Sequence, residues 1–331
     1  MRRVAPERVT VIHDEDLIAP ARFVADHDGI DGFTLTAEQQ ARWSAHLAKA
    51  DVLWDFRFAA RAGAHLLDLA PNVKWVQTTS AGVGPLVNTL GLVDTDVIVT
   101  TASGVHSEPL AEFVFLALLM HAKELRRLQG WQEAAHWERF CSDELDGRTL
   151  AIVGPGKIGR QVAKVGKAFG MRVSVMGSRG GDERRAELGV DAIYTRDRLH
   201  EMLASADAVV LCCPHTPETE GMIDGAAFAA MKPGVSFVNI SRGQVVDEGA
   251  MIEALRSGQI GFAALDVFAT EPLPADSPLW SLENVLVSPH SGSTANSENG
   301  KITDIFCHNL TCLLDGRHDE MRNVLDKARM Y

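Results

Sequence analysis

The sequence has few cysteines, and they lack the spacing that zinc sites and redox motifs use. Five occur among 331 residues, at positions 141, 212, 213, 307 and 312, and no two form a C-x-x-C pair. This usage favours reduced thiols and a cytoplasmic location, and it argues against a zinc site. We therefore expect no metal in this protein.

Positive charge is also scarce. Lys and Arg number 32 against 44 Asp and Glu, which gives a net charge of −12. No block of basic residues offsets this excess, so we expect no nucleic-acid partner.

Long apolar runs are missing as well. The longest, residues 113–120, is far shorter than the roughly 20 residues that a membrane-spanning helix needs. Residues 1–16 contain no apolar core of the kind that a signal peptide requires. We expect neither membrane insertion nor secretion.

The most informative stretch that is present is LAIVGPGKIG, residues 150–159. A short apolar run typical of a strand leads into three glycines with G-x-G-x-x-G spacing, and an apolar helical pattern follows. Gly154 suits a tight turn, Gly156 lets the backbone approach a pyrophosphate, and Gly159 lets the helix pack closely on the strand. The helix start then offers free N–H groups to the phosphates. This segment predicts a dinucleotide site.

Strand and helix patterns alternate along the chain, which indicates parallel sheets with helices on both faces. The expected strands are residues 8–12, 32–35, 51–54, 73–77, 96–100, 149–153, 171–176, 192–194, 208–212, 235–240, 261–267 and 285–288. The expected helices are residues 37–50, 61–70, 107–129, 157–169, 198–204, 224–231, 248–257 and 295–314.

This order predicts an α/β protein with two doubly wound parallel-sheet domains. Residues 103–292 contain the glycine motif and would form a dinucleotide-binding Rossmann domain. It would be inserted into a flavodoxin-like substrate domain made of residues 1–102 and 293–331, to which the last helix returns. A cleft between the domains would hold the ligand.

Three polar stretches each follow a strand of the second predicted sheet. They contain Arg242, Glu271 and His290, and the carboxyl ends of parallel strands share one edge, so these side chains can converge. Arginine can clamp a carboxylate with two hydrogen bonds, and histidine transfers protons near neutral pH. A carboxylate beside the imidazole fixes its orientation and favours its charged form. The set suits acid–base chemistry on a carboxylate-bearing substrate.

Each of these residues also has a plain structural explanation. Arg242 can be a surface ion-pair partner, Glu271 a loop charge and His290 a hydrogen-bonded turn histidine. The small residues 79–84, which follow the fourth strand, suit either a ligand-binding loop or an ordinary turn.

Four aromatic residues leave similar alternatives open. Trp54 and Phe56 can line a substrate pocket or pack in the core. Trp131 and Trp137 can pack in the core or against another subunit.

Taken together, the motifs resemble those of the D-isomer-specific 2-hydroxyacid dehydrogenases over nearly the whole chain. The match comprises the glycine loop, Arg-Gly at 242–243, Glu-Pro at 271–272 and Pro-His at 289–290. The separations agree too: 271 − 242 = 29 residues and 290 − 271 = 19 residues. Residues 213–219 are similar to the family's loop on the adenine side, and residues 110–112 to the start of its long inter-domain helix.

The resemblance implies reversible NAD(P)H-dependent reduction of a small 2-oxoacid to the D-2-hydroxyacid by a homodimer built through the cofactor domain. Arg242 would bind the substrate carboxylate and keto oxygen, His290 would protonate that oxygen, and Glu271 would hold His290. Domain closure would expel water. The substrate-binding residues would be Ala81, Gly82, Val83, Arg242 and His290. The cofactor-binding residues would be Gly154, Pro155, Gly156, Lys157, Ile158, Gly159, Ser178, Arg179, Cys213, Pro214, Thr219, Ile240, Ser241, Arg242, Asp266, His290 and Gly292.

The residues after the second strand of the cofactor domain predict a preference for NADP over NAD. An NAD site usually has an acidic residue there, on the ribose 2′-hydroxyl. Here Gly177, Ser178 and Arg179 follow the strand, and the next acid is Asp182. Glycine leaves room for a phosphate, while serine and arginine can bond to it. The alternative is that Arg179 points into solvent and both cofactors are used.

Four further points stay open at this level. Gly84 stands where many family members have aspartate, which leaves the packing of residues 79–84 undecided. A dinucleotide-sensing corepressor on the same fold could also keep the three catalytic residues, although the acidic composition counts against it. Formate or phosphite oxidation would need a tighter pocket, and the substrate side chain is not determined.

Overall fold

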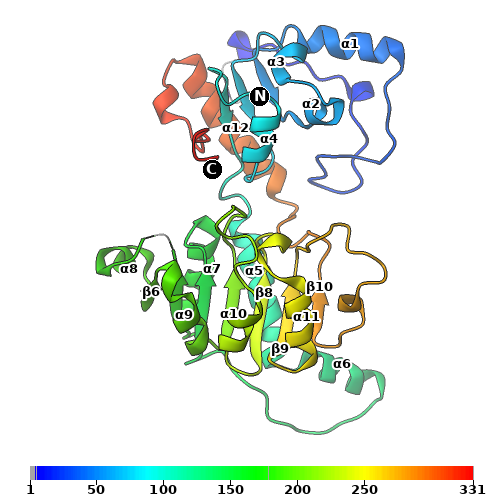
Figure 1. Ribbon diagram of the computed structural model, residues 1–331. Coiled ribbons are helices and arrows are strands. Elements are labelled where there is room, and N and C mark those ends of the chain that lie inside the picture. Colours follow the sequence, from blue (N-terminus) through cyan, green and yellow to red (C-terminus); the bar gives the residue numbers. More distant parts are fainter. Residues whose placement is uncertain (1–3, 5, 178, 331) are drawn as a thin grey trace. The chain divides into compact units, whose positions relative to one another are not determined.

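The computed structural model of the protein describes residue 4, residues 6–177 and residues 179–330. The chain divides into two compact units, Met1–Val105 with Thr294–Tyr331 (unit 1) and His106–Ser293 (unit 2). The chain therefore leaves unit 1, builds unit 2 and returns to unit 1 (Figure 1). The domain limits and roles suggested by the sequence stay predictions.

Unit 2 is organised around a parallel sheet with the strand order β10-β9-β8-β7-β4-β5-β6. Growth of the sheet reverses at β4: β5 and β6 lie on one side of it, and β7 to β10 lie on the other. Ligands of such sheets bind at this switch point. The strands are β4 (Thr149–Val153), β5 (Arg172–Met176), β6 (Ala192–Tyr194), β7 (Ala208–Leu211), β8 (Val235–Asn239), β9 (Ile260–Leu265) and β10 (Val285–Val287). The expected Rossmann architecture is confirmed.

Helices cover both faces of this sheet (Figure 1). One face packs on α9 (Leu199–Ser205), α10 (Gly225–Ala230) and α11 (Glu248–Arg256), and the other on α5 (Ser107–Ala122) and α7 (Lys157–Ala168). In β4, Ala151 and Val153 face the first group, while Leu150 and Ile152 face the second. Because successive strand residues point to opposite faces and both faces are buried, the strand is apolar from Leu150 to Val153. Unit 2 also contains α6 (Leu125–Glu133), α8 (Asp182–Leu188), η3 (Arg196–Arg198), η4 (Gly243–Val245) and η5 (Pro278–Trp280).

Unit 1 contains a smaller parallel sheet with the order β1-β2-β3. Its strands are β1 (Val52–Trp54), β2 (Trp75–Gln77) and β3 (Ile98–Thr100). Its helices are α1 (Ala37–Leu47), α2 (Arg57–Ala62), α3 (Leu66–Leu69), α4 (Gly84–Thr89) and α12 (Glu298–Leu314), with the short turns η1 (Pro6–Arg8), η2 (Glu15–Leu17) and η6 (His318–Glu320).

The last long helix packs on the unit 1 sheet through an aromatic stack. The rings of Trp75 in β2 and Phe306 in α12 lie 4.8 Å apart and nearly parallel. The indole nitrogen of Trp75 donates to Thr100 Oγ1 at 2.8 Å, and that hydroxyl donates to Gln77 Oε1 at 2.7 Å. A buried tryptophan needs such a partner for its N–H. The contact explains why residues 294–331 belong to unit 1.

Two expected strands, at residues 8–12 and 32–35, are wrong. Both segments are irregular, and their apolar residues find no buried sheet face: Val11 and Ile12 are exposed. Gly32 has φ +74°, which a strand does not use. Their β-type composition was therefore not matched by a partner strand.

Two expected helices are broken by left-handed residues. The helix predicted at 107–129 is α5 and α6, separated at Glu124 with φ +52°. The helix predicted at 61–70 is α2 and α3, separated at Gly63 with φ +61°. A left-handed residue cannot continue a right-handed helix. No helix in the described residues is long and apolar enough to cross a membrane.

Candidate active site

The glycine loop joins β4 to α7, and steric contacts require two of its three glycines. Gly154 has φ +111°, and a Cβ there would lie 2.8 Å from the backbone nitrogen of Cys213. A Cβ on Gly159 would collide with the carbonyl oxygen of Gly154. Gly156 differs, because a Cβ there would meet nothing within 4 Å. Space is thus kept beside the turn at the start of α7, where a pyrophosphate would approach.

The thiols behind this loop serve packing. Cys212 donates from Sγ to the carbonyl oxygen of Gly154 at 3.1 Å, and burial raises the pKa of this thiol. Burial also raises the pKa of Cys213, to about 11. Both therefore stay protonated near neutral pH, which makes them poor nucleophiles.

Residues following four neighbouring strands reach the same sheet edge as the glycine loop. Because β10, β9, β8, β7 and β4 are consecutive and parallel, His290, Asp266, Arg242 and Cys213 all follow strands at their carboxyl ends. The sequence predicts that these side chains converge, and that prediction depends on the strands being parallel neighbours in one sheet.

The clearest functional pair is His290 with Glu271. Nδ1 of His290 lies 2.8 Å from Glu271 Oε2, while Oε1 of the same carboxylate accepts a hydrogen bond from the backbone N–H of Phe268 at 3.0 Å. The two side chains stay partly exposed, at 44% and 36%. His290 has φ +54°, a sparsely populated conformation for a residue other than glycine. The turn thus holds the imidazole at the sheet edge with one ring nitrogen engaged by a carboxylate.

Asp266 follows β9 and is only 2% exposed. Burial raises the pKa of its carboxyl group, although hydrogen bonds from Ser288 and Gly292 and the positive charge of His290 oppose the rise. Oδ1 accepts from Ser288 Oγ at 2.6 Å and from the backbone N–H groups of Ser291 and Gly292 at 2.9 and 2.8 Å. Asp266 therefore ties the turn that carries His290 to the end of β9. Sequence reasoning missed the supporting role of Ser288, whose only signal is its position directly before Pro-His.

Arg242 is exposed, and the structure does not bond it to either member of the His–Glu pair. Its one recorded side-chain hydrogen bond within the described chain goes from Nη1 to the carbonyl oxygen of Ser241 at 2.6 Å. The turn before it is fixed by Asn239, whose Oδ1 accepts from the N–H and hydroxyl of Ser241 at 3.0 and 2.8 Å. The guanidinium is therefore available to an anion.

Gly243 brings the Arg242 turn against the loop that leads to Glu271. A Cβ on Gly243 would collide with the backbone of Phe268 and Ala269. Gln244 adds a hydrogen bond from Nε2 to the carbonyl oxygen of Ala269 at 3.1 Å. Glycine at position 243 therefore allows the turn that carries Arg242 to pack directly on the backbone of Phe268 and Ala269.

We expect Gly243→Ala to lower the free energy of unfolding by about 1–3 kcal/mol or more, because the methyl group meets backbone that cannot swing aside. Urea unfolding followed by circular dichroism measures the change. Gly300→Ala is the matched control, since a Cβ there meets nothing within 4 Å. Equal stability of the Gly243 variant and the wild type would contradict the steric role.

The remaining predicted cofactor residues lie along the same edge. Gly177 follows β5, and a Cβ there would lie 2.8 Å from Cγ of Pro155 in the glycine loop. Arg179 is exposed, and Ser178 lies outside the described residues. Thr219 folds its own loop: its hydroxyl donates to the carbonyl oxygen of Pro214 at 2.8 Å. Ile240 is buried after β8.

The predicted substrate loop of unit 1 follows β2. The N–H of Val83 donates to the carbonyl oxygen of Ala81 at 3.1 Å, whereas the structure records no acceptor within the described chain for those of Ala81 and Gly82. A Cβ on Gly84 would collide with the backbone of Met330. The glycine that departs from the family pattern therefore accommodates the C-terminal segment.

The four aromatic residues have different surroundings. Phe56 is fully buried in the unit 1 core, and Trp54 is partly exposed with its ring 5.4 Å from that of Phe306. Trp131 lies outside the main core, with its ring 4.4 Å from the guanidinium of Arg127. Trp137 is 94% exposed.

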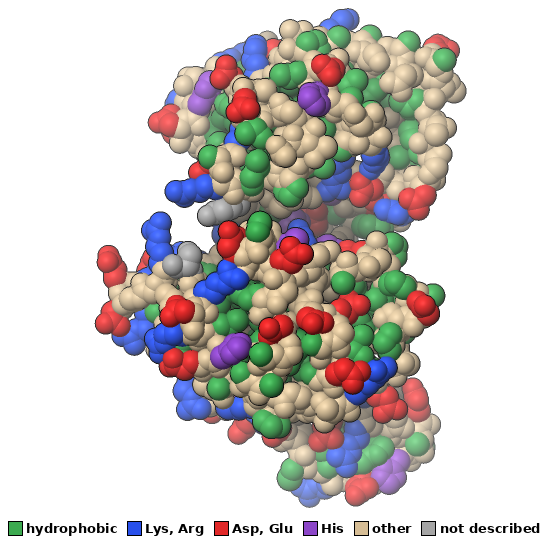
Figure 2. All heavy atoms as spheres, viewed as in Figure 1, with side chains coloured by type: hydrophobic (Ala, Val, Ile, Leu, Met, Phe, Trp, Pro, Cys, Tyr) green, Lys and Arg blue, Asp and Glu red, His purple; other side chains and the backbone are tan. Residues whose placement is uncertain are grey.

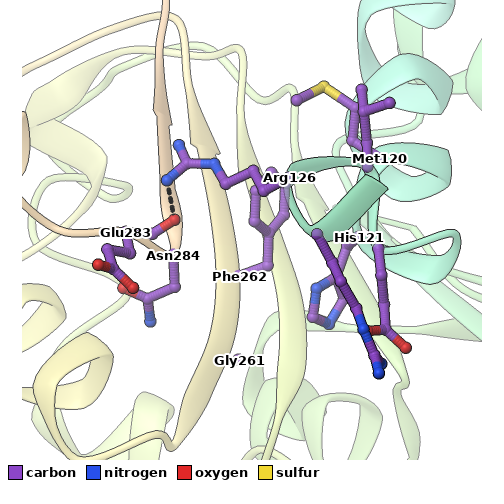
Figure 3. A pocket seen from close by; sticks show the side chains of 10 residues that line it. Met120, His121, Arg126, Gly261, Phe262, Glu283 and Asn284 are labelled. Carbon is purple, nitrogen blue, oxygen red and sulfur yellow. Dashed lines mark hydrogen bonds and ion pairs between the residues drawn. The ribbon is translucent and has the colours of Figure 1, made fainter. Parts of the chain in front are cut away.

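A pocket of about 290 Å³ lies elsewhere in unit 2 (Figure 3). Gly261 is near the start of β9, and Glu283 and Asn284 directly precede β10, so the pocket is at the amino edge of the sheet. Arg126 reaches across to the backbone, donating to the carbonyl oxygens of Glu283 and Val285. The pocket is therefore separate from the edge that carries the His–Glu pair.

Comparison with known proteins agrees with this geometry. The family model described as "D-isomer specific 2-hydroxyacid dehydrogenase, NAD binding domain" matches residues 115–292. A D-3-phosphoglycerate dehydrogenase from Mycobacterium leprae is 37% identical over 301 residues, covering 88% of this chain and 54% of that protein. The chain thus spans about half the length of that relative.

Solved structures give the same result. A D-isomer specific 2-hydroxyacid dehydrogenase family protein from Aeromonas salmonicida has a TM-score of 0.75 and 33% identity, covering 87% of this chain and 89% of that one. An NADPH-dependent glyoxylate/hydroxypyruvate reductase from Sinorhizobium meliloti, in complex with NADP and sulfate, has a TM-score of 0.71 and 26% identity, covering 85% of each chain. With its glycine loop at the switch point of a parallel sheet, the chain belongs to the D-isomer-specific 2-hydroxyacid dehydrogenase family, whose members are NAD(P)-dependent oxidoreductases.

Proposed function

We propose that this protein reduces a small 2-oxoacid to the D-2-hydroxyacid, with NADPH preferred over NADH. The observation that supports this most directly is the pairing of His290 with Glu271 at the sheet edge that carries the glycine loop. A bound reduced nicotinamide supplies a hydride for the carbonyl carbon. The product then needs one proton on the former keto oxygen.

His290 is the proposed proton donor, and the geometry indicates which of its nitrogens acts. Because Nδ1 faces Glu271 at 2.8 Å, Nε2 is the nitrogen available to the substrate oxygen. Glu271 is held in turn by the N–H of Phe268, so the carboxylate fixes the ring orientation. The proton leaves Nε2 for the oxygen as the hydride reaches carbon, which balances the reduction.

Arg242 is the proposed partner of the substrate carboxylate. Its side chain has no carboxylate partner within 4.0 Å among the described residues. A guanidinium matches a carboxylate through two parallel hydrogen bonds. The backbone N–H groups of Ala81 and Gly82 are proposed as further donors, because no acceptor is recorded for them within the described chain. Val83 N–H would first have to leave Ala81.

The substrate is proposed to carry no second anionic group. Two arginines of α2, one of them bonded to Ser80 in the 79–83 loop, already have carboxylate partners within unit 1. Arg57 donates to Asp28 at 3.1 Å and to Ser80 Oγ at 2.6 Å, and Arg61 donates to Asp28 at 2.6 Å. A phosphate bound by these two arginines would have to displace Asp28. Glyoxylate, hydroxypyruvate and pyruvate fit better.

The experiment that tests the function is a panel of 2-oxoacids with NADPH and NADH, followed by loss of absorbance at the nicotinamide band. Glyoxylate, hydroxypyruvate, pyruvate and 3-phosphohydroxypyruvate form the core of the panel. We expect turnover of at least one small member and the lowest kcat/KM for the phosphorylated one. Tight cofactor binding without turnover of any member would instead support a binding protein.

The residues of the glycine loop fit a dinucleotide, and the β5 edge favours a 2′-phosphate. Gly177 packs against Pro155, so the structure leaves no room for an acidic side chain at the position that would bond to the 2′-hydroxyl. Arg179 stands two residues later with no hydrogen bond or ion pair recorded in the described chain.

We therefore expect kcat/KM for NADPH to exceed that for NADH, and Arg179→Ala to reduce the ratio. One charge-assisted contact of about 1.4 kcal/mol corresponds to a 10-fold change. Steady-state kinetics at saturating oxoacid measure both ratios. A wild-type preference for NADH would refute the cofactor assignment, and an unchanged ratio in the variant would remove Arg179 from it.

The protein is further proposed to be a homodimer through the cofactor domain. The arm, residues 125–144, extends from unit 2 and has no buried residue in the single chain (Figure 1). Figure 2 shows hydrophobic, charged and histidine side chains together on the lowest part of unit 2, where the arm lies. A helix of nine residues gains most of its stability from packing, and α6 has no buried residue in the single chain.

Sedimentation velocity tests the dimer. We expect twice the chain mass of 35.9 kDa for the wild type and weaker association for Trp137→Ser, because this exposed indole would be buried by the partner. Trp280→Ser is the control, an exposed tryptophan outside the arm. A monomer at micromolar concentration would contradict the proposal.

A further inference from the structure

A second arginine lies beside Arg179 at the end of the neighbouring strand. β5 and β6 pair in parallel with Met176 opposite Tyr194, and the N–H of Gly177 donates to the carbonyl oxygen of Tyr194 at 3.1 Å. The loops that follow stay in contact, since a Cβ on Gly180 would lie 3.5 Å from Cγ2 of Thr195. Arg196 comes directly after Thr195, so its backbone lies beside the segment that contains Arg179.

The charge of Arg196 acts on the loop that follows β7. It lowers the pKa of Cys213, against the larger rise that burial causes. The pKa of Glu218 is lowered mainly by a hydrogen bond from Thr216, and the charge of Arg196 adds a smaller effect in the same direction. Both residues belong to the 213–219 segment, which the family resemblance puts on the adenine side of the cofactor. The charge of Arg196, which follows β6, thus acts on the segment that follows β7, while Arg179 follows β5.

The arginines nearby differ from these two in having partners. Arg198 donates to Glu201 at 2.6 and 2.8 Å and lies over the ring of Tyr194. Arg160 and Arg184 both pair with Glu187. Neither Arg179 nor Arg196 has a recorded hydrogen bond or ion pair to another described residue. In a chain of net charge −12, two such arginines on one loop cluster mark a place for an anion.

We propose that Arg196 is a second determinant of cofactor choice, which binds the 2′-phosphate of NADP together with Arg179. This rests on the proposed function, because it takes the 213–219 segment and the β5 edge as the adenosine side. A phosphate monoester offers three acceptor oxygens, so two guanidinium groups can bind it from two loops. Position 177 adds no carboxylate against it, since Gly177 packs on Pro155.

Glu218 gives the proposal a second consequence. Its carboxylate interacts with the charge of Arg196, and the side chain is exposed on the same loop cluster. It would repel a 2′-phosphate and compete for the guanidinium. Removing its charge with Glu218→Gln should therefore tighten binding of the phosphorylated nucleotide.

Isothermal titration calorimetry on the full chain tests this without turnover. The probes are NADPH, NADH, 2′,5′-ADP and 5′-AMP, and the variants are Arg196→Ala, Glu218→Gln and the control Arg198→Ala, whose charge is already engaged by Glu201. We expect Arg196→Ala to raise Kd for NADPH and 2′,5′-ADP about 10-fold and to change Kd for NADH and 5′-AMP less than twofold. Arg198→Ala should change none of them.

The inference is overturned if Arg196→Ala leaves Kd for NADPH unchanged, or weakens NADPH and NADH equally. Loss of NADPH affinity in Arg179→Ala but not in Arg196→Ala would overturn this inference and leave the proposed function standing. Selective loss in Arg196→Ala together with no turnover of any 2-oxoacid would support the phosphate site and reject the proposed reaction.

Discussion

His290→Ala is expected to lower kcat by roughly 10²–10⁴-fold, the usual contribution of a positioned general acid. An imidazole can transfer a proton near neutral pH, and Nδ1 of His290 is occupied by Glu271 at 2.8 Å. Without it, the developing charge on the former keto oxygen must take its proton from water. Steady-state kinetics with the preferred oxoacid measure the loss.

Two additional measurements make this result specific to proton transfer. A cofactor deuterated at the transferred position should show a larger isotope effect on kcat in the variant, because the chemical step becomes limiting. Glu271→Gln should slow turnover less than His290→Ala, and the double variant should be no slower than His290→Ala alone, since Glu271 acts through the imidazole. Near-normal kcat in His290→Ala would refute the assignment of the proton donor.

Arg242→Ala is expected to lower kcat/KM for the oxoacid by about 10²-fold or more. If Arg242 binds the substrate carboxylate as proposed, the variant loses two charge-assisted hydrogen bonds and the orientation that brings the carbonyl to the hydride and the proton. Both KM and kcat should therefore worsen. The cofactor dissociation constant, measured separately, shows whether the loss concerns the substrate.

Arg242→Lys separates charge from shape. Lysine keeps the positive charge but not the planar fork, so we expect an activity between those of the wild type and Arg242→Ala. Gly243 stays in place in both variants, so the turn that packs on Phe268 is preserved. If Arg242→Ala changed neither KM nor kcat, the substrate carboxylate would have to be bound by another residue.

Much of the cofactor unit could be predicted from local sequence. The strand at 149–153 has the predicted limits, because its buried residues 150–153 are all apolar and Gly154 follows them directly. The glycine spacing carried its own steric reason: Gly154 and Gly159 each occupy a position where a Cβ would strike backbone or a carbonyl oxygen. The local sequence indicates such steric constraints, because the glycines that satisfy them occur at a fixed spacing.

Unit 1 was harder to predict for a physical reason. Segments 8–12 and 32–35 have strand-like composition but no strand beside them, and strand formation needs a partner to bond to. The break at Gly63 in unit 1, like the break at Glu124 in unit 2, depends on a single left-handed residue. Glycine commonly adopts a left-handed conformation and so indicates a possible break, whereas nothing in the sequence predicts that Glu124 has φ +52°.

The sequence by itself determined the family, the α/β class and the residue types at the candidate site. Only the tertiary structure decided that His290 and Glu271, 19 residues apart, meet at 2.8 Å, and that Gly243 lets the Arg242 turn pack on the loop before Glu271. It also decided that β5, which precedes Arg179, lies beside β6, which precedes Arg196. These relations depend on strand order, which is set by how the whole sheet buries its two faces, and no local pattern of residues carries that information.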